Sequence, residues 1–338
     1  MKYLETIKWM ALSSLLAFAS SSCVDTHVVE PETLGESGAI SSEVVINLTN
    51  PKGADTKAGG DYKLRYVARI FQGTTTAALN KAIATAEIST GDLSENNQEN
   101  QIIFEVQPDS YYTILVFADY IPSETTANSS GHYKDCFYNT TEDEKTVLLI
   151  PSPGESSDII STSFFNNDYH DCFYGMETFE KGKEEKVINL VLQRAVAKVI
   201  FREKSDNLGN VGITASQIGI HRQFYLPNGS PQALKTSNVT KTALDNVEEV
   251  TDNNKDIFYF YTFGGATSSE VSIDFNLTST NLPEPQPFSV TGIPVKRNFK
   301  TIVSGEYIPA PEVPQPSIGD IILNLTTSAD WAQEEIEK

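Results

Sequence analysis

Cysteine and histidine are the residue types in this sequence that come closest to forming a chemical site. Cys136 and Cys172 occupy near-identical strings, Asp-Cys-Phe-Tyr, and His132 and His170 lie just before them. On paper these four residues make a Cys2His2 zinc set, which requires ligands that converge tetrahedrally. His170 and Cys172 are one residue apart, and that spacing is cramped for two ligands on one strand. We therefore expect no metal here, and we expect the histidines to be exposed in loops.

The remaining residues offer no pattern for catalysis. The chain has four histidines, and it lacks a nucleophile elbow, a glycine-rich phosphate loop and a His-Glu pair at helical spacing. Acidic residues are plentiful, but a glycosidase needs two carboxylates at a defined separation across a cleft, and nothing marks such a pair. We expect no enzymatic activity and no cofactor.

Length, composition and charge narrow the class of protein. The 338 residues suffice for about two domains, at roughly 100 to 200 residues each. A hydrophobic fraction of 39% is too large for a disordered chain. The 25 Lys and Arg against 45 Asp and Glu give a net charge of −20, so the phosphates of a nucleic acid would be repelled. An acidic, folded protein with no nucleic-acid partner is expected.

The first residues have the order of a secretory signal. Two lysines precede an apolar stretch at residues 10–19, and three serines and Cys23 follow it. A cysteine directly after small residues resembles the lipobox of bacterial lipoproteins, although Ser20 stands where leucine is more usual. We predict a signal peptide at residues 1–22 and a lipid such as palmitate on Cys23, which would anchor the chain in the outer membrane. Residues 23–49 would then be a lipidated tether and the first strand.

If Cys23 carries a lipid, Cys136 and Cys172 are the two thiols that remain. Export would put them in an oxidising or at least non-reducing compartment. Two alternatives remain open for them. A disulfide between them would stabilise the fold by roughly 3 to 4 kcal/mol, because it restricts the unfolded chain. Otherwise they are two separate buried cysteines that act as small apolar residues.

Beyond the tether, apolar residues recur mainly at every second position, which is the period of a half-buried β-strand. Residues 42–49, 62–71 and 270–278 show this alternation clearly. In the second of these segments the pattern predicts that Arg65 and Arg69 face solvent. Many short strands punctuated by Pro, Gly and Asn are typical of β-sandwiches, so an all-β fold is expected.

Segments 111–120 and 257–263 are apolar on both faces, and we predict that each lies at the centre of a sandwich. Helical periodicity is scarce, and short helices are predicted only at residues 75–86 and 328–338. Two strand-like runs meet near Arg194 with only three residues between them. That junction predicts an N-terminal sandwich at residues 50–194 and a C-terminal sandwich at residues 195–338.

Several segments in order along the chain resemble the fimbrillin superfamily of Bacteroidales surface lipoproteins, the FimA/Mfa-like type V pilins. Besides the lipobox-like Cys23, they are residues 112–120 (YTILVFADY), 169–175 (YHDCFYG), 190–201 (LVLQRAVAKVIF) and 293–305 (IPVKRNFKTIVSG). The resemblance implies two tandem transthyretin-like β-sandwich domains. It also implies a fimbrial subunit or an accessory or tip adhesin on the outer surface, with other pilin subunits and a host or glycan receptor as partners.

In that family a protease removes the leading segment together with the first strand, and a strand from the next subunit replaces it. Here the strand in question would be residues 43–49, which we expect at a sheet edge. Family members that form the stalk are cut after arginine, but this chain has no arginine before Arg65, so only Lys52 and Lys57 offer basic cut sites. The alternative is a strand that stays in place permanently.

Two further alternatives concern the end of the chain and the function. The alternating residues 321–326 are either the last strand of the second sandwich, which we favour, or a donor strand for a neighbour. Instead of a pilus subunit, the chain could be a monomeric surface lipoprotein that binds glycans.

Overall fold

The computed structural model describes residues 41–51, 60–75, 78–89, 100–150, 159–160, 164–204, 209–232, 234–239, 256–308 and 324–329. Cys23, Lys52 and Lys57 lie outside these residues. The described chain consists of strands and short 3-10 turns, which confirms the predicted all-β class. Within it, no helix is long and apolar enough to cross a membrane.

The first half of the chain forms two sheets that face one another. One has the order β10 (Lys186–Val191), β1 (Ser42–Thr49), β4 (Asn100–Val106), and the other has the order β11 (Gln193–Arg194), β9 (Cys172–Lys181), β5 (Ser110–Pro122), β2 (Tyr62–Gln72), β3 (Ala84–Ser89). Alternate apolar residues of both sheets meet in one buried cluster, because successive side chains of a strand point to opposite faces. The apolar segment 111–120 lies in the central strand of the larger sheet, as expected.

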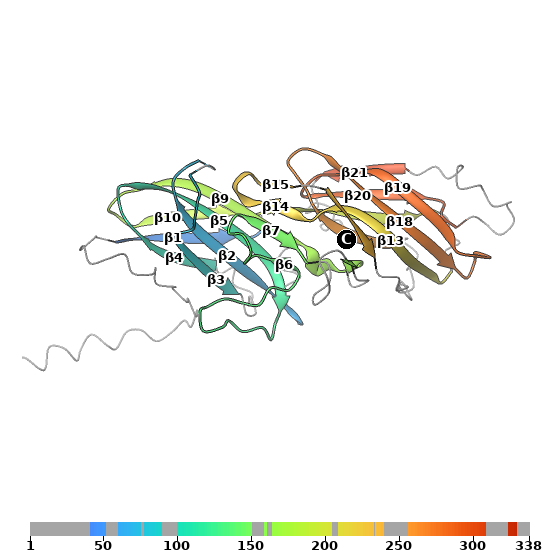
Figure 1. Cartoon of the computed structure of the whole chain (residues 1–338), viewed down its shortest axis with the longest axis horizontal. Helices are drawn as coiled ribbons and strands as arrows, with labels where there is room; N and C mark the ends of the chain where they lie inside the picture. The colour runs from blue at the N-terminus through green and yellow to red at the C-terminus, as the bar shows by residue number, and fades with distance from the viewer. Residues whose placement is uncertain are drawn as a thin grey trace, which may run out of the picture.

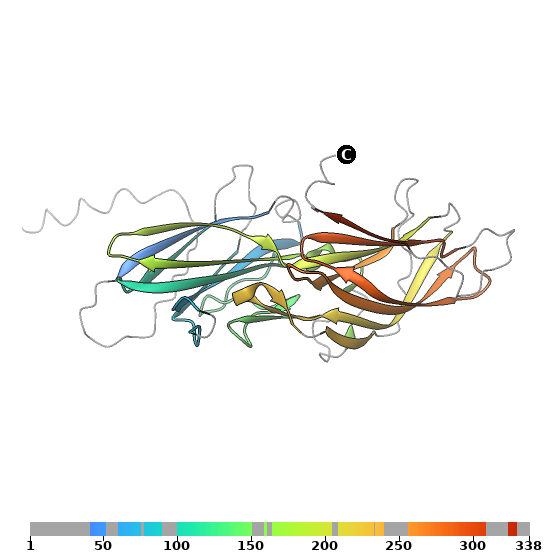
Figure 2. The same ribbon diagram turned by 90° about the horizontal axis from the view of Figure 1, so that it is seen from above.

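The second half forms another pair of sheets, at the other end of the long axis in Figures 1 and 2. One has the order β17 (Asp256–Phe263), β12 (Val196–Glu203), β20 (Phe299–Gly305), β21 (Asn324–Ala329), and the other has the order β19 (Gln286–Val295), β18 (Ser269–Ser279), β13 (Val211–His221), β16 (Leu234–Val239), β8 (Ile159–Ile160). In β18 the residues that alternate with polar neighbours are all buried: Val271, Ile273, Phe275 and Leu277. Strand β21 pairs with β20 of its own half.

A fifth, small sheet connects the two halves. Its order is β15 (Ser230–Pro231), β14 (Gln223–Tyr225), β7 (Thr146–Leu149), β6 (Tyr138–Asn139), so two strands come from each half (Figure 1). The chain leaves β11 of the first pair of sheets and enters β12 of the second with only Ala195 between them. Because β7 and β8 pair with strands of the second half, the domain limits at residues 50–194 and 195–338 stay a prediction.

Strand β17 lies at the edge of its sheet and is nevertheless mostly buried. Asn166, from the first half, covers this edge. Its N–H donates to the carbonyl of Tyr259 at 3.0 Å, and its side-chain oxygen accepts from the N–H of Tyr259 at 2.9 Å. Asn166 has a φ of 53°, a left-handed conformation in which asparagine is enriched. Polar groups at this edge therefore find partners without another strand.

Two sequence-based predictions about elements were wrong. The first strand does not lie at a sheet edge, because β1 pairs with β4 on one side and with β10 on the other. The helix expected at residues 75–86 does not form in the described part of that segment, which is irregular and then enters β3. Local propensity favoured the helix, but the backbone of β3 gains a full ladder with β2.

At Ala195, where the chain passes from the first half to the second, the packing predicts that one small substitution lowers the stability strongly. Gly264 donates its N–H to the carbonyl of Ala195 at 3.0 Å, and a Cβ atom at Gly264 would lie 2.3 Å from the backbone nitrogen of Arg297. Backbone cannot move aside as a flexible side chain can, so Gly264→Ala should lower the free energy of unfolding by about 1 to 3 kcal/mol. Gly182→Ala is the matched control, because a Cβ there meets nothing within 4 Å. Urea unfolding of both variants measures the difference, and equal midpoints would contradict it.

Candidate assembly site

The candidate assembly site is strand β1 together with the two strands that flank it. The strand runs parallel to β10, with Val44 opposite Lys186, and antiparallel to β4, with Val44 opposite Phe104. Its side chains Ile46 and Leu48 are 0% and 2% exposed and point into the core. Every second residue is apolar because one face of the strand is inside the sandwich. Strand β1 thus supplies both backbone pairing and core packing.

The beginning of β1 is fastened to the turn between β9 and β10. The ammonium group of Lys181, which is fully buried, donates to the Ser42 hydroxyl at 2.5 Å, to the Gly182 carbonyl at 2.8 Å and to the Glu184 carbonyl. The Ser42 hydroxyl in turn donates to the carbonyl of Lys183 at 2.9 Å. A buried ammonium needs such acceptors. Removal of β1 would therefore take away one partner of Lys181 and leave it the two carbonyls of the turn.

The outer face of the β10-β1-β4 sheet carries a row of amide side chains. Asn47 donates to the side-chain oxygen of Asn189 at 2.8 Å and accepts from the side chain of Gln101 at 3.2 Å. These three residues lie directly opposite one another in the register of the three strands. Cross-strand pairs of this kind favour one register over its neighbours, since a slip by one residue would break the row.

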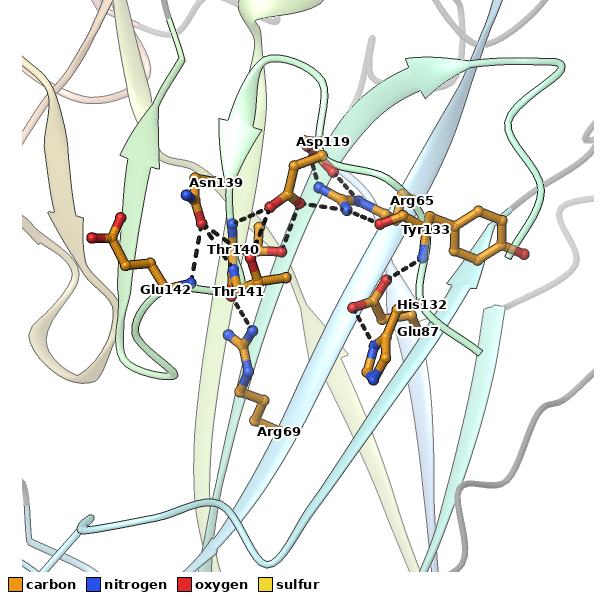
Figure 3. Close-up of polar contacts among 11 residues, drawn as sticks. Arg65, Arg69, Glu87, Asp119, His132, Tyr133, Asn139, Thr140, Thr141 and Glu142 are labelled. Atoms are coloured by element: carbon orange, nitrogen blue, oxygen red, sulfur yellow. Dashed lines mark hydrogen bonds and ion pairs between the residues drawn. The ribbon is translucent and has the colours of Figure 1, made fainter. Parts of the chain in front are cut away.

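A different set of polar groups lies buried under the long loop at residues 123–145 (Figure 3). Arg65 on β2 donates to both carboxylate oxygens of Asp119 on β5, at 2.9 and 2.8 Å, and to Asp135 in the loop at 2.8 Å. Both Arg65 and Asp119 are 0% exposed. Burial by itself would lower the pKa of Arg65, but the two carboxylates raise it above its ordinary value, so the guanidinium stays charged.

The same loop is fastened at two further points. Arg69 on β2 donates to the carbonyls of Thr140 and Glu144. Glu87 on β3 accepts from the backbone N–H of Tyr133 at 2.9 Å and lies 2.9 Å from Nδ1 of His132. Figure 3 shows the contacts of Arg69 with Thr140 and of Glu87 with His132 and Tyr133. They hold residues 132–144 against strands that the loop shields from water.

The prediction that Arg65 and Arg69 face solvent was wrong, because they are 0% and 4% exposed. The alternation correctly separated the two faces of β2, but both faces are buried: one by the opposite sheet and the other by the loop. Sequence alone carried one usable signal, namely that Asp119 interrupts the otherwise apolar strand β5. A charged residue inside an apolar strand needs a partner.

The cysteines and histidines do not form a site in the structure. Cys136 is half-buried and Cys172 is buried, and both have free thiols in the structure. The disulfide between them stays a prediction. Burial raises the pKa of Cys136 to about 11, which leaves the thiol uncharged at neutral pH. Among the described residues, no group of three or more His, Cys, Asp and Glu side chains could hold a metal ion.

The two histidines differ in environment, and the expectation of exposed loop histidines was wrong for one of them. The side chain of His132 is 37% exposed, whereas His170 is 1% exposed and its ring lies 4.7 Å from that of Phe137 and 4.9 Å from that of Phe164. Among the described residues, neither ring nitrogen of His170 has a hydrogen-bond partner. Burial lowers the pKa of His170 to about 3, because the charged ring would be poorly solvated among the aromatic rings.

Residues 36–311 match the model of DUF6562, a family of unknown function, and the chain belongs to this family. No curated protein matches the sequence. Among solved structures, the chain is similar to three proteins of the Bacteroidales. One is a fimbrial assembly protein from Parabacteroides distasonis, with 13% identity over 86% of this chain and 99% of that one and a TM-score of 0.40. The second is the fimbrial anchor protein Mfa2 from Porphyromonas gingivalis, with 11% identity over 86% of this chain and 98% of that one and a TM-score of 0.44. The third is the tip fimbrial protein Mfa3 from Porphyromonas gingivalis, with 13% identity over 86% of this chain and 100% of that one and a TM-score of 0.42.

The buried ion pair predicts a strong effect when one partner is removed. Asp119→Ala leaves Arg65 buried with Asp135 as its remaining carboxylate, so the free energy of unfolding should fall by about 3 to 5 kcal/mol. Replacing both partners, as Arg65→Met with Asp119→Leu, should cost less, because both fully buried charges are removed, and Asp135, which is 15% exposed, keeps its hydrogen bonds from Thr140. Asp256→Ala is the control: its partner Arg202 is 38% exposed, and a loss below about 1 kcal/mol is expected. The interpretation fails if the double variant is less stable than Asp119→Ala in urea unfolding.

The environment of His170 predicts a stabilising substitution. His170→Phe keeps the ring contacts and removes two unpaired polar atoms, so the free energy of unfolding at pH 7 should rise by about 1 kcal/mol. The pKa is about 3 in the folded chain and about 6.5 in the unfolded one. Below pH 6.5 the unfolded chain therefore binds an extra proton, and the unsubstituted chain loses about 1.4 kcal/mol per pH unit at this residue. Urea unfolding at pH 7 and pH 4.5 should show a smaller pH-dependent loss in His170→Phe, and equal losses would contradict the assignment.

Proposed function

We propose that the chain is a fimbrial subunit or accessory adhesin of the bacterial outer surface that assembles by replacement of strand β1. The observation that carries this proposal is the place of β1, a strand close to the start of the chain that lies between β4 and β10. The resemblance of the sequence to fimbrillins supports the same role. No catalytic step is part of the proposal.

The connection of β1 to the rest of the chain makes its removal simple. The strand ends at Thr49 and the next one begins at Tyr62, so one cut between them separates everything before it from the sandwich. Lys52 and Lys57 are the basic residues in this link. A strand in the middle of the chain would need two cuts. Cleavage after Arg65 is disfavoured, because Arg65 is fully buried within β2.

Loss of β1 would leave a groove with specific requirements for its next occupant. The free edges of β4 and β10 would both lack backbone partners, and the inward side chains of Val44, Ile46 and Leu48 would leave an apolar channel. A donor strand would have to run antiparallel to β4 and parallel to β10, and it would have to present apolar residues at every second position. Because donor and groove lie on different parts of the molecule, such pairing is heterologous and produces a filament.

In this proposal the precursor is an outer-membrane lipoprotein anchored at Cys23, and its assembly partners are other pilin subunits. Receptor binding, to a host surface or to a glycan, belongs to the adhesin form of the same role. A lipoprotein that stays monomeric and keeps β1 is the alternative outcome of the test below.

N-terminal sequencing of the protein shed from cells tests the proposal directly. Assembled material should start at residue 53 or 58, directly after Lys52 or Lys57, and should form oligomers that are stable in warm detergent. Replacing both lysines by glutamine should keep the precursor intact and monomeric, and replacing Lys63, in the following strand, by glutamine is the matched control. Assembled material that starts at a lipidated Cys23 would refute strand removal.

A further inference from the structure

Strand β10 is an edge strand, and the side of it that faces away from β1 has no partner strand among the described residues. A groove of about 740 Å³ runs beside it, between β10 and β9, and is lined by residues 177–182, residues 186–189 and Asp109. Exposed edges usually carry a bulge, a proline or several charges that prevent pairing with another chain. The sequence of β10, KVINLV, has neither proline nor acidic residue, and Lys186 is its only charge.

The direction of the free backbone groups follows from one hydrogen bond. The N–H of Leu192 donates to the carbonyl of Thr49 on β1 at 2.9 Å. Backbone groups of successive residues in a strand point to opposite sides, so the even-numbered residues pair with β1. The N–H and C=O groups of Val187, Asn189 and Val191 therefore point toward the free edge.

The side chains of these same three residues lie on the outer face of the sheet. Val187 is 51% exposed and Val191 is 62% exposed, so two apolar side chains lie open on the same face of one short edge strand. Between them lies Asn189, the last member of the amide row that includes Asn47 and Gln101. The free edge thus presents the repeat Val, Asn, Val, which reads the same in both directions.

We propose that β10 pairs with β10 of a second copy of this chain, antiparallel, across a two-fold axis at Asn189. In this register Asn189 lies opposite Asn189 of the other copy, and Val187 lies opposite Val191. All three pairs have their backbone groups directed at the partner, so each pair exchanges both of its N–H···O=C bonds. The amide rows of the two copies join into one, and each exposed valine is covered by another valine.

A second copy fits this edge better than an unrelated strand, because the pattern complements itself. A two-fold contact requires that the same patch serve both partners, and the symmetric Val-Asn-Val repeat meets that requirement. No carboxylate lies within β10 itself, so no acidic side chain stands in the paired segment. The proposed pairing uses the outer edge of β10, whereas β1 occupies its inner edge, so it neither requires nor prevents strand replacement. Subunits joined in this way would associate side by side.

Sedimentation of the full chain with Cys23→Ser, which removes the predicted lipid site, tests the pairing. A dimer that dissociates on dilution is expected. Val187→Lys with Val191→Lys places like charges opposite each other at both valine pairs and should raise the dissociation constant at least about tenfold. Val187→Lys with Val191→Glu places opposite charges at the same two pairs and should restore the dimer. This rescue depends on the antiparallel register, because only there do residues 187 and 191 face each other.

Two further variants distinguish loss of pairing at the β10 edge from a loss of monomer stability and from the loss of any exposed apolar side chain. Asn189→Pro removes an N–H that β1 does not use and should weaken the dimer without lowering the thermal midpoint of the monomer by more than a few degrees. Leu234→Lys changes an equally exposed apolar residue, 49% exposed on β16, and should leave the dimer unchanged. The proposal is refuted by a chain that stays monomeric up to about 100 μM, the weak range of specific association. It is also refuted if the Lys/Glu variant dimerises no better than the Lys/Lys variant.

Discussion

The pairing of β1 with strands on both of its sides is the constraint on which the first half of this protein depends. Strand β1 lies near the start of the chain, yet Ile46 of β1 lies opposite Ile188 of β10, which is 142 residues further along the sequence. Such long-range contacts carry a cost in loop-closure entropy and are expected to slow folding. Among the described residues, β1 is joined covalently to the rest of the fold through its C-terminal end, and it pairs with other strands on both sides. One proteolytic cut after Thr49 could therefore release β1, but β4 and β10 would then both lose the strand that joins them.

The loop at residues 123–145 gives the larger sheet of the first half a second buried face. Charged residues that alternate along β2 would ordinarily be solvated, but here they meet carboxylates and carbonyls of the loop. The Arg65–Asp119 pair is not by itself a sign of high stability, since hydrophobic residues of similar size often pack as well as a buried ion pair. Further along, β7 continues into a sheet with β14 of the second half. The loop therefore connects the outer face of one sandwich to the beginning of the other.

Much of the fold could be predicted because strand alternation is a local property. The pattern in β18 and the two-sided apolar segment of β5 correctly indicated which residues are buried, except for Tyr111 at the start of that segment, which is exposed. Local pattern gave no information about neighbours, so the edge position expected for β1 and the solvent exposure expected for Arg65 were both wrong. The prediction for His170 failed for the same reason: its burial comes from Phe137 and Phe164, which the sequence could not place beside it.

The amino-acid sequence by itself determined the all-β class, the alternation of buried and exposed positions and the strongly acidic charge, because each of these follows from residue types and their spacing. Only the tertiary structure decided which strands are central and which are edges. Strand order depends on backbone hydrogen bonds between distant segments, and every residue except proline offers the same donor and acceptor. The sequence pattern of β1 and that of β10 are both compatible with either place. Packing of the whole sandwich puts β1 inside and leaves β10 with a free edge.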